Sequence, residues 1–130
     1  MTNNNSYILE NENVSVDISM LYDISGNDEG YINKIVQTFL EKMPDNLEKI
    51  EQGIKSQDWE NVYKSAHHTK SSLCVIKISE MSDWVVQVEV NAKNETGLEI
   101  LPDLIEKIKE KFLFAEGLLN EKLRAKFAAL

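Results

Sequence analysis

Segment 66–72 holds the side chains whose types and spacing are best suited to chemistry. It reads Ala-His-His-Thr-Lys-Ser-Ser and contains both histidines of the chain. A neutral imidazole nitrogen is a nucleophile near pH 7. On a helix, the ammonium group of Lys70 lies one turn after His67, where it would neutralise an incoming phosphoryl group. The small Ser71 and Ser72 let a partner surface come close. These residues suit a phosphoryl acceptor, although an exposed His near a Lys is more often an ordinary solvated helix face.

Other catalytic chemistries find little support in the sequence. The five glycines match no phosphate-binding loop, so we expect no nucleotide site. His67 and His68 would point about 100° apart on a helix and cannot chelate one ion together. Cys74 lies roughly 10 Å along the helix from His67, which is too far for a Cys-His pair. The sequence therefore predicts no cofactor and no metal, and a metal-dependent enzyme built in a bundle core is the least favoured alternative.

The charge balance excludes several classes of partner. The chain has 14 Lys and Arg against 22 Asp and Glu, a formal net charge of −8. Nucleic-acid binding needs clustered Lys and Arg, and anionic lipid repels an acidic chain, so we expect no nucleic acid and no membrane as partners. No apolar window approaches the roughly 20 residues that span a bilayer, and the N-terminus does not resemble a secretory signal. Together with a single Cys, these features predict a cytoplasmic protein.

Apolar residues recur at helical spacing from about residue 16 onward, and this periodicity predicts helices only. Pro44 falls inside the longest helix and either kinks it, which we favour, or ends it. The run Val85–Val90 has the composition of a strand, but the helical pattern on both sides places it in a helix. Asp58 and Ser79 are the expected N-caps of the third and fourth helices. The predicted helices cover approximately residues 16–24, 28–55, 59–76, 80–93 and 98–127.

The order and length of these elements predict the fold class. Four amphipathic helices joined by short connections are typical of an antiparallel up-down four-helix bundle, here all-α with a short extra N-terminal helix. A chain of 130 residues predicts one domain that buries a core without disulfides. We expect residues 14–128 to form this bundle domain. The Asn-rich residues 1–13 are expected to be a flexible N-terminal lead-in.

Segment 66–72 resembles Ala-His-x-Leu-Lys-Gly-Ser, the motif of the histidine-containing phosphotransfer (HPt) domains of two-component phosphorelays. Two positions depart from it, because Thr69 stands where Leu is usual and Ser71 where Gly is usual. The resemblance covers roughly residues 16–93 and includes Val88-Glu89, where the family has a Leu-Glu pair. The last helix completes the bundle. The positions that match the motif are Ala66, His67, Lys70 and Ser72.

The resemblance implies a histidine phosphocarrier in a His-Asp phosphorelay, and not an enzyme with its own nucleotide site. Nε2 of His67 would accept a phosphoryl group from a receiver-domain phosphoaspartate and pass it to another receiver. Lys70 would stabilise charge on the phosphoryl oxygens, while Ser72 either donates a hydrogen bond or is merely small. The receiver would supply the aspartate and Mg²⁺. The implied partners are response-regulator receiver domains and a sensor or hybrid histidine kinase, with the chain itself a monomer.

A docking surface is expected around His67, where Lys64 and Lys70 would make the local surface less acidic than the whole chain. Each candidate could equally be an ordinary surface residue. Because Thr69 and Ser71 depart from the motif, a degenerate HPt-like module that binds receivers without carrying phosphate is the alternative function. The candidate docking residues by helical position are Tyr63, Lys64, His68, Ser71 and Val75.

Overall fold

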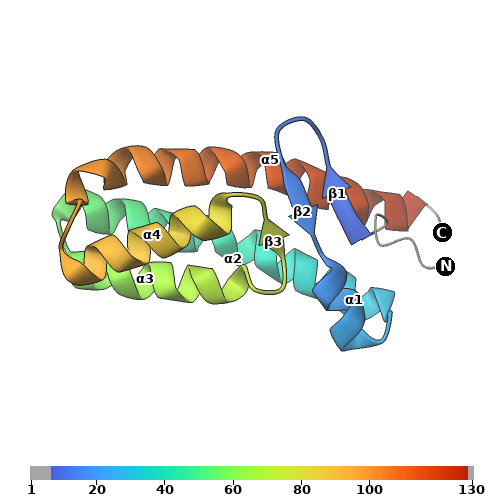
Figure 1. Cartoon of the computed structure of the whole chain (residues 1–130). Helices are drawn as coiled ribbons and strands as arrows, with labels where there is room; N and C mark the ends of the chain where they lie inside the picture. Colours follow the sequence, from blue (N-terminus) through green and yellow to red (C-terminus); the bar gives the residue numbers. More distant parts are fainter. Residues whose placement is uncertain (1–6, 129–130) are drawn as a thin grey trace.

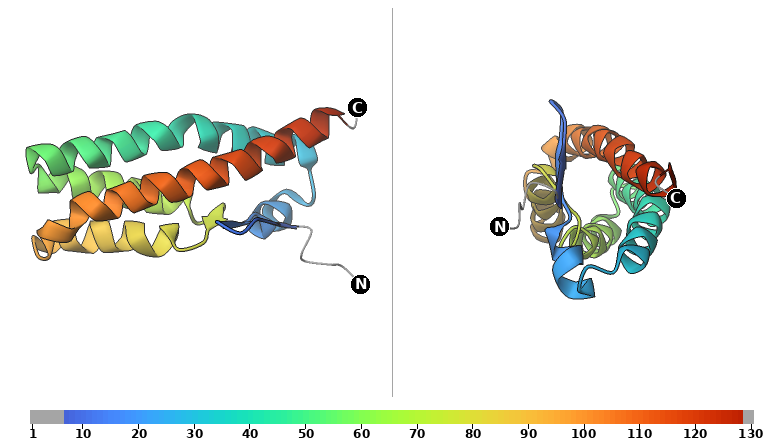
Figure 2. Two further views of the ribbon diagram at one scale, coloured as in Figure 1. Left: turned by 90° about the horizontal axis from the view of Figure 1, so that it is seen from above. Right: turned by 90° about the vertical axis from the view of Figure 1, so that its right-hand side faces the viewer.

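Five α-helices account for most of residues 7–128, the part of the chain that the computed structural model describes (Figure 1). The second to fifth helices run alternately up and down and surround a common axis, as the end-on view of Figure 2 shows. This arrangement confirms the predicted four-helix bundle with a short extra N-terminal helix. The helices are α1 (Ser19–Ser25), α2 (Glu29–Ser56), α3 (Trp59–Ser72), α4 (Met81–Asn94) and α5 (Leu101–Ala128), and a single 3₁₀ turn (Leu98–Ile100) precedes α5.

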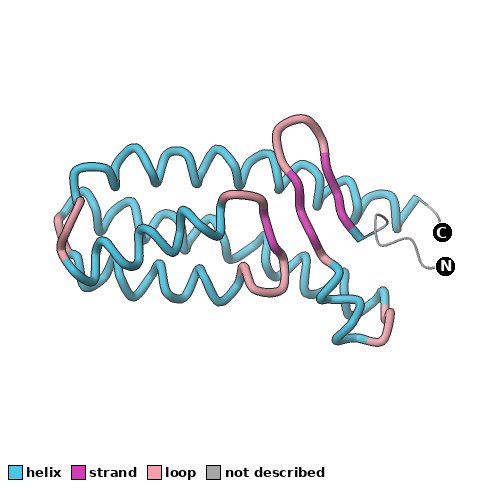
Figure 3. Tube along the Cα trace, in the orientation of Figure 1, coloured by secondary structure: helices cyan, strands magenta, loops and turns pink. Residues whose placement is uncertain are grey.

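Three short strands form a small antiparallel sheet that the prediction of helices only did not include. They are β1 (Ile8–Glu10), β2 (Ser15–Asp17) and β3 (Lys77–Ile78), in the order β1-β2-β3 (Figure 3). Residues 16 and 17, predicted as helical, instead pair with β3 in the linker between α3 and α4. Strands of two or three residues are too short for a recognisable alternation. In addition, β3 pairs with a strand far back in the sequence, since Val16 lies opposite Ile78.

The described part of the expected lead-in is attached to the bundle. Tyr7 stacks on Tyr22 with 4.2 Å between the ring centroids, and Leu9 packs against the core. Nζ of Lys111 on α5 donates to the main-chain oxygen of Asn13 at 2.9 Å. Residues 7–13 therefore belong to the folded unit, because their apolar and aromatic contacts compensate for the conformational entropy that the segment loses on ordering. The preceding Asn-rich residues lie outside the described part of the chain.

Helix α2 continues through Pro44, which confirms the preferred interpretation of one long helix over two. The proline ring is exposed, and its missing N–H costs the helix one intrahelical hydrogen bond without ending it. The helix begins at the cap Asp28, whose carboxylate accepts a hydrogen bond from the Tyr31 N–H at 3.1 Å. Twenty-eight residues thus form one side of the bundle without interruption.

The caps of α3 and α4 set where the two central helices begin. Asp58 accepts from the Asn61 N–H at 3.2 Å, as predicted. The prediction that Ser79 caps α4 is wrong, because Glu80 occupies that position. The Ser79 hydroxyl oxygen instead accepts from the Ser15 N–H at 3.0 Å. The polar side chain expected at a cap therefore ties the sheet to the α3–α4 linker.

The core fills the interior between the four long helices. On α3 it uses one face at steps of three or four residues, as predicted. Close packing of α2 on α3 explains Gly53, where an added Cβ would lie 2.7 Å from Cγ2 of Val62. Within residues 7–128 no helix combines the length and the apolar character that crossing a bilayer requires. The fully buried residues of α3 and the turn after it are Val62, Ala66, Thr69, Leu73 and Ile76.

Candidate functional site

Helix α3 presents His67 and Lys70 on one face, toward α4. The buried stripe that includes Ala66 and Leu73 fixes the rotation of the helix about its axis. His67 and Lys70 lie one turn apart outside that stripe, with 57% and 37% of their side chains exposed. Packing of the core therefore determines where the imidazole and the ammonium group stand.

Glu89 on α4 binds both side chains with a single carboxylate. Its Oε2 lies 2.5 Å from Nδ1 of His67, and its Oε1 lies 2.8 Å from Nζ of Lys70. Because a charged carboxylate only accepts hydrogen bonds, Nδ1 is the donor in this contact, and in the neutral ring Nε2 keeps the lone pair. Nε2 is thus the nucleophilic nitrogen of the neutral ring, on a side chain that is 57% exposed.

Opposing effects set the charge of Glu89, whose side chain is only 10% exposed. Burial alone would raise the pKa of its carboxyl group, because the charged form loses water. Hydrogen bonds and attraction from Lys70 and His67 outweigh this, so the pKa of Glu89 lies below its ordinary value. The carboxylate is therefore charged at neutral pH.

Tyr63 and Ser71 also lie beside His67, as the helical spacing predicted. The rings of Tyr63 and His67 are 6.4 Å apart between centroids, and Nζ of Lys93 on α4 lies 5.4 Å from the centre of the Tyr63 ring. The Ser71 hydroxyl donates to the main-chain oxygen of His67 at 3.3 Å, which turns this side chain back onto its own helix. These contacts leave an aromatic and cationic border around an accessible imidazole.

The remaining candidates, on α3 and in the turn after it, form none of the described hydrogen bonds or ring contacts with the His67 side chain. Lys64 pairs with Glu60 at 3.2 Å on the exposed surface of the helix, and His68 is exposed. Ser72 and Val75 line an apolar groove of about 150 Å³ between α2 and the end of α3, with Phe39 among its other walls. Among the described residues, the Ser72 hydroxyl makes no hydrogen bond with His67 or Lys70. Ser72 therefore does not support the histidine directly in this structure.

Glu89 is the site residue that the sequence reasoning missed. In the sequence it stands out only as part of the Val88-Glu89 pair, which by itself assigns it no role. A usable signal existed, because Glu89 shares the inward face of α4 with Val85 and Ala92, which are buried. A carboxylate on a buried face needs a charged or hydrogen-bonding partner.

Among the described residues, no group of His, Cys, Asp and Glu side chains could hold a metal ion.

Comparisons with known proteins agree on one family. The sequence pattern of the Hpt domain matches residues 34–125, which is more than half of the chain. The structure is similar to histidine-containing phosphotransfer protein B from Pseudomonas aeruginosa PAO1 (TM-score 0.77, 17% identity), covering 85% of this chain and 95% of that one. It is also similar to the HPT domain of an Hpt sensor hybrid histidine kinase from Shewanella (TM-score 0.69, 14% identity), covering 84% and 93%. A search of curated proteins found no match.

Proposed function

The chain belongs to the Hpt domain family, and from this premise we propose that it carries a phosphoryl group on His67 within a His-Asp phosphorelay. His67 accepts the group from a receiver-domain phosphoaspartate and passes it to another receiver. The observation that supports this most directly is the exposed imidazole whose Nδ1 is engaged by Glu89 while Lys70 stands one turn away.

In the proposed reaction, Nε2 of His67 attacks phosphorus in line with the departing aspartate oxygen. The N–P bond forms, the aspartyl O–P bond breaks, and the electron pair of that bond returns to the receiver carboxylate. The receiver supplies the aspartate and Mg²⁺. The chain requires no nucleotide site of its own for this step, and we propose that it acts as a carrier and not as an enzyme.

Lys70 stabilises negative charge on the phosphoryl oxygens in this proposal. Its ammonium group is bound to Glu89, but with 37% of its side chain exposed it can turn outward to a phosphoryl group on Nε2. A positioned cation acts most strongly where charge develops and water is excluded by the docked partner. Ser72 contributes by its small size, since its side chain lies toward the α2–α3 groove.

The proposed partners are receiver domains on both sides of the relay and the sensor or hybrid kinase that feeds it. The docking surface surrounds His67. The site is complete within one chain, so the transfer unit is a monomer. The residues proposed to touch the receiver are Tyr63, Lys64, His68, Ser71 and Val75.

The two departures from the motif do not weigh against carrying phosphate. The Thr69 hydroxyl is buried and donates to the Ser65 main-chain oxygen at 2.8 Å, so its polarity is satisfied. The Ser71 hydroxyl donates to the backbone of its own helix, and the His67 side chain stays 57% exposed. A degenerate module that binds receivers without carrying phosphate therefore lacks a specific observation in its favour.

The test is phosphoryl transfer from the phosphorylated receivers of the source organism. The chain should acquire acid-labile, alkali-stable phosphate, His67→Gln should acquire none, and the comparison variant His68→Gln should still acquire phosphate. Phosphate on His67→Gln but not on His68→Gln would contradict the site. Receiver binding without any transfer, unchanged in His67→Ala, would instead identify the degenerate module.

A further inference from the structure

We propose that the outer face of α2 and α5 binds a basic amphipathic helix of a partner protein, on the side of the bundle away from His67. The end-on view of Figure 2 shows α2 and α5 on one side of the bundle and α3 and α4 on the other. The inference goes beyond the proposed function, because it assigns a second surface that takes no part in phosphoryl transfer. A partner held there would leave the imidazole of His67 open to receivers.

A groove of about 380 Å³ with apolar walls lies between α2 and α5. Pro44 and Leu47 line it from α2, and Phe112 and Leu113 line it from α5. The Leu113 side chain is 64% exposed, more than any other large apolar side chain in the described part of the chain. Burial of this side chain against a partner would be favourable, and a groove between two helices suits the apolar stripe of a third helix.

Gly117 lies one turn after Leu113 on the same exposed face of α5. Glycine inside a helix is destabilising relative to alanine, so its presence there calls for a physical reason. Packing within the chain gives none, because a Cβ added to Gly117 would meet no described atom within 4 Å. A glycine on an open helix surface lets another backbone approach closely, and a docked helix would use this space.

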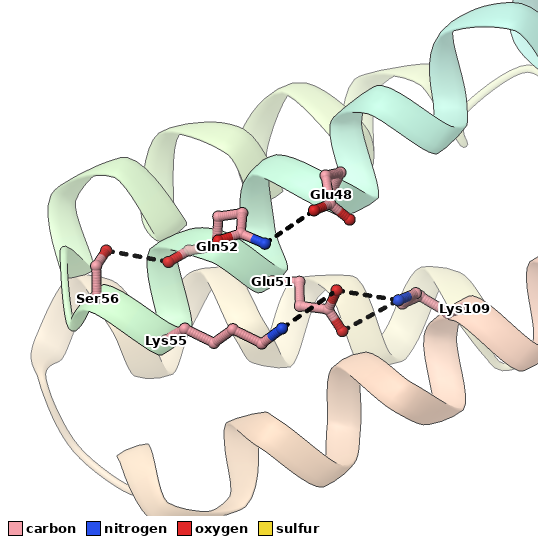
Figure 4. Close-up of polar contacts among 6 residues, drawn as sticks. All are labelled: Glu48, Glu51, Gln52, Lys55, Ser56 and Lys109. Atoms are coloured by element: carbon pink, nitrogen blue, oxygen red, sulfur yellow. Dashed lines mark hydrogen bonds and ion pairs between the residues drawn. The ribbon is translucent and has the colours of Figure 1, made fainter.

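The charges around the groove specify a basic partner. Glu48 and Glu116 line the groove, and Glu110 stands on the same exposed side of α5. None of these three carboxylates forms an ion pair with a cation of the described residues. Lys109 also lines the groove, but both oxygens of Glu51 bind its ammonium group, as Figure 4 shows. A helix with Lys or Arg on both sides of its apolar stripe would therefore complement this face.

The same charges argue against other occupants of the groove. A second copy of the chain would bring the same carboxylates, and each chain has a formal net charge of −8. Nucleic acid and anionic lipid are repelled by an acidic face in the same way. The side of the bundle that carries His67 differs, because Lys70 lies one turn from the imidazole and Lys93 lies over the neighbouring Tyr63 ring. The two sides thus suit partners of different charge.

The probe is a synthetic helical peptide of about 18 residues, with a leucine stripe flanked by lysines, titrated into the ¹⁵N-labelled chain. Amide signals of α2 and α5 around the groove should shift, while those around His67 should not. Leu113→Ala and Gly117→Gln should each weaken binding by about tenfold or more, since one removes the apolar anchor and the other blocks close approach. An otherwise identical peptide with glutamates in place of the lysines should not bind.

Ile24→Ala is the matched control for loss of an exposed apolar side chain. Ile24 is 58% exposed, but it lies on α1 and does not line the groove. This variant should bind the lysine peptide as the original chain does. Circular dichroism would verify that all three variants fold.

Several results would overturn the inference. One is a set of shifts spread over the whole acidic surface, and another is equal affinity of the lysine peptide for the original chain, Leu113→Ala and Gly117→Gln. A third is no binding at peptide concentrations up to about 1 mM. If the α2 and α5 signals shifted with protein concentration alone, the occupant would be a second copy and not a basic helix. None of these results bears on phosphate transfer to His67, which phosphorylated receivers test separately.

Discussion

Among the carboxylate–lysine pairs that bridge helices in the described part of the chain, two are alike in exposure but differ in what the carboxylate binds. Glu51 on α2 binds Lys109 on α5 at 3.0 and 3.1 Å, and Glu89 on α4 binds Lys70 on α3 at 2.8 Å (Figure 4 shows the first pair). The carboxylates are 13% and 10% exposed, and each lysine is 37% exposed. Glu51 gives both oxygens to Lys109, whereas Glu89 gives one oxygen to Lys70 and the other to His67.

The comparison shows how a structural contact acquires chemistry. In the α2–α5 pair the other cation near Glu51 is Lys55, 4.0 Å from Oε1, and the hydrogen bond from Lys109 chiefly lowers the pKa of Glu51. In the α3–α4 pair the second oxygen fixes a tautomer and leaves an exposed nucleophile. A histidine in reach of the carboxylate is what makes the second pair a candidate site.

The largest effect on stability is expected from a substitution in the hydrophobic core and not in either ion pair. Leu73 is 2% exposed on the buried side of the His67 helix. Leu73→Ala should lower the free energy of unfolding by about 2–5 kcal/mol, because it removes buried methyl groups and leaves a cavity. Urea unfolding measures this. A loss below about 0.5 kcal/mol would show that the buried face of α3 has been misassigned.

The next largest expected effect is a difference in phosphoryl-transfer rate between variants of the two lysines. Lys70→Ala should slow phosphoryl transfer by about 100-fold, the effect of losing one positioned charge at the reacting group. Lys109→Ala removes a similarly exposed lysine from a similar pair and should leave the rate unchanged. Single-turnover transfer from a phosphorylated receiver measures both. Equal rates for the two variants would remove the functional distinction between the pairs.

The two carboxylates should contribute similarly to stability although they differ in function. Glu51→Gln and Glu89→Gln should each lower the free energy of unfolding by about 1 kcal/mol, since each loses a charge-assisted hydrogen bond in a partly solvated place. Chemical denaturation at neutral pH measures this. If only Glu89→Gln destabilised the fold, the first pair would not be the structural counterpart of the second.

The smallest expected effect is a loss of folding stability in acid, where both carboxylates become protonated and both ion pairs weaken. Both carboxyl pKa values are lowered in the folded chain, so the stabilisation is present above the unfolded value of about 4.3 and is lost as pH falls through the folded values. Urea unfolding should show stability declining below about pH 4.3, and the double variant Glu51→Gln, Glu89→Gln should decline less. An equal decline in the double variant would contradict the assignment.

The sequence was sufficient for the four-helix bundle because the apolar spacing was long and regular on every helix. It also predicted that α2 continues through Pro44. The sequence pattern did not predict the three strands. A two-residue strand such as Lys77–Ile78 has no periodicity of its own and depends on a distant partner. Short-range patterns therefore located the elements, while the pairing of the N-terminal segment required the three-dimensional arrangement.

Within the candidate site, the sequence predicted residues on one helix better than contacts between helices. The spacing of His67 and Lys70 put them on one face of α3, and the structure agrees. Ser72 was placed with them by motif, yet it lines the groove toward α2. Glu89 was missed because the register of α4 against α3 decides which of its residues meets His67, and that register depends on packing of the whole core.

The most direct test of the account is to load the chain with phosphate from a receiver and locate it by heteronuclear NMR. The account predicts a single phosphoryl group on Nε2 of His67, with hydrogen retained on Nδ1 at neutral pH. Phosphate on Nδ1 of His67 would contradict the contact with Glu89 as the determinant of the reactive nitrogen. Phosphate on His68 would contradict the site itself.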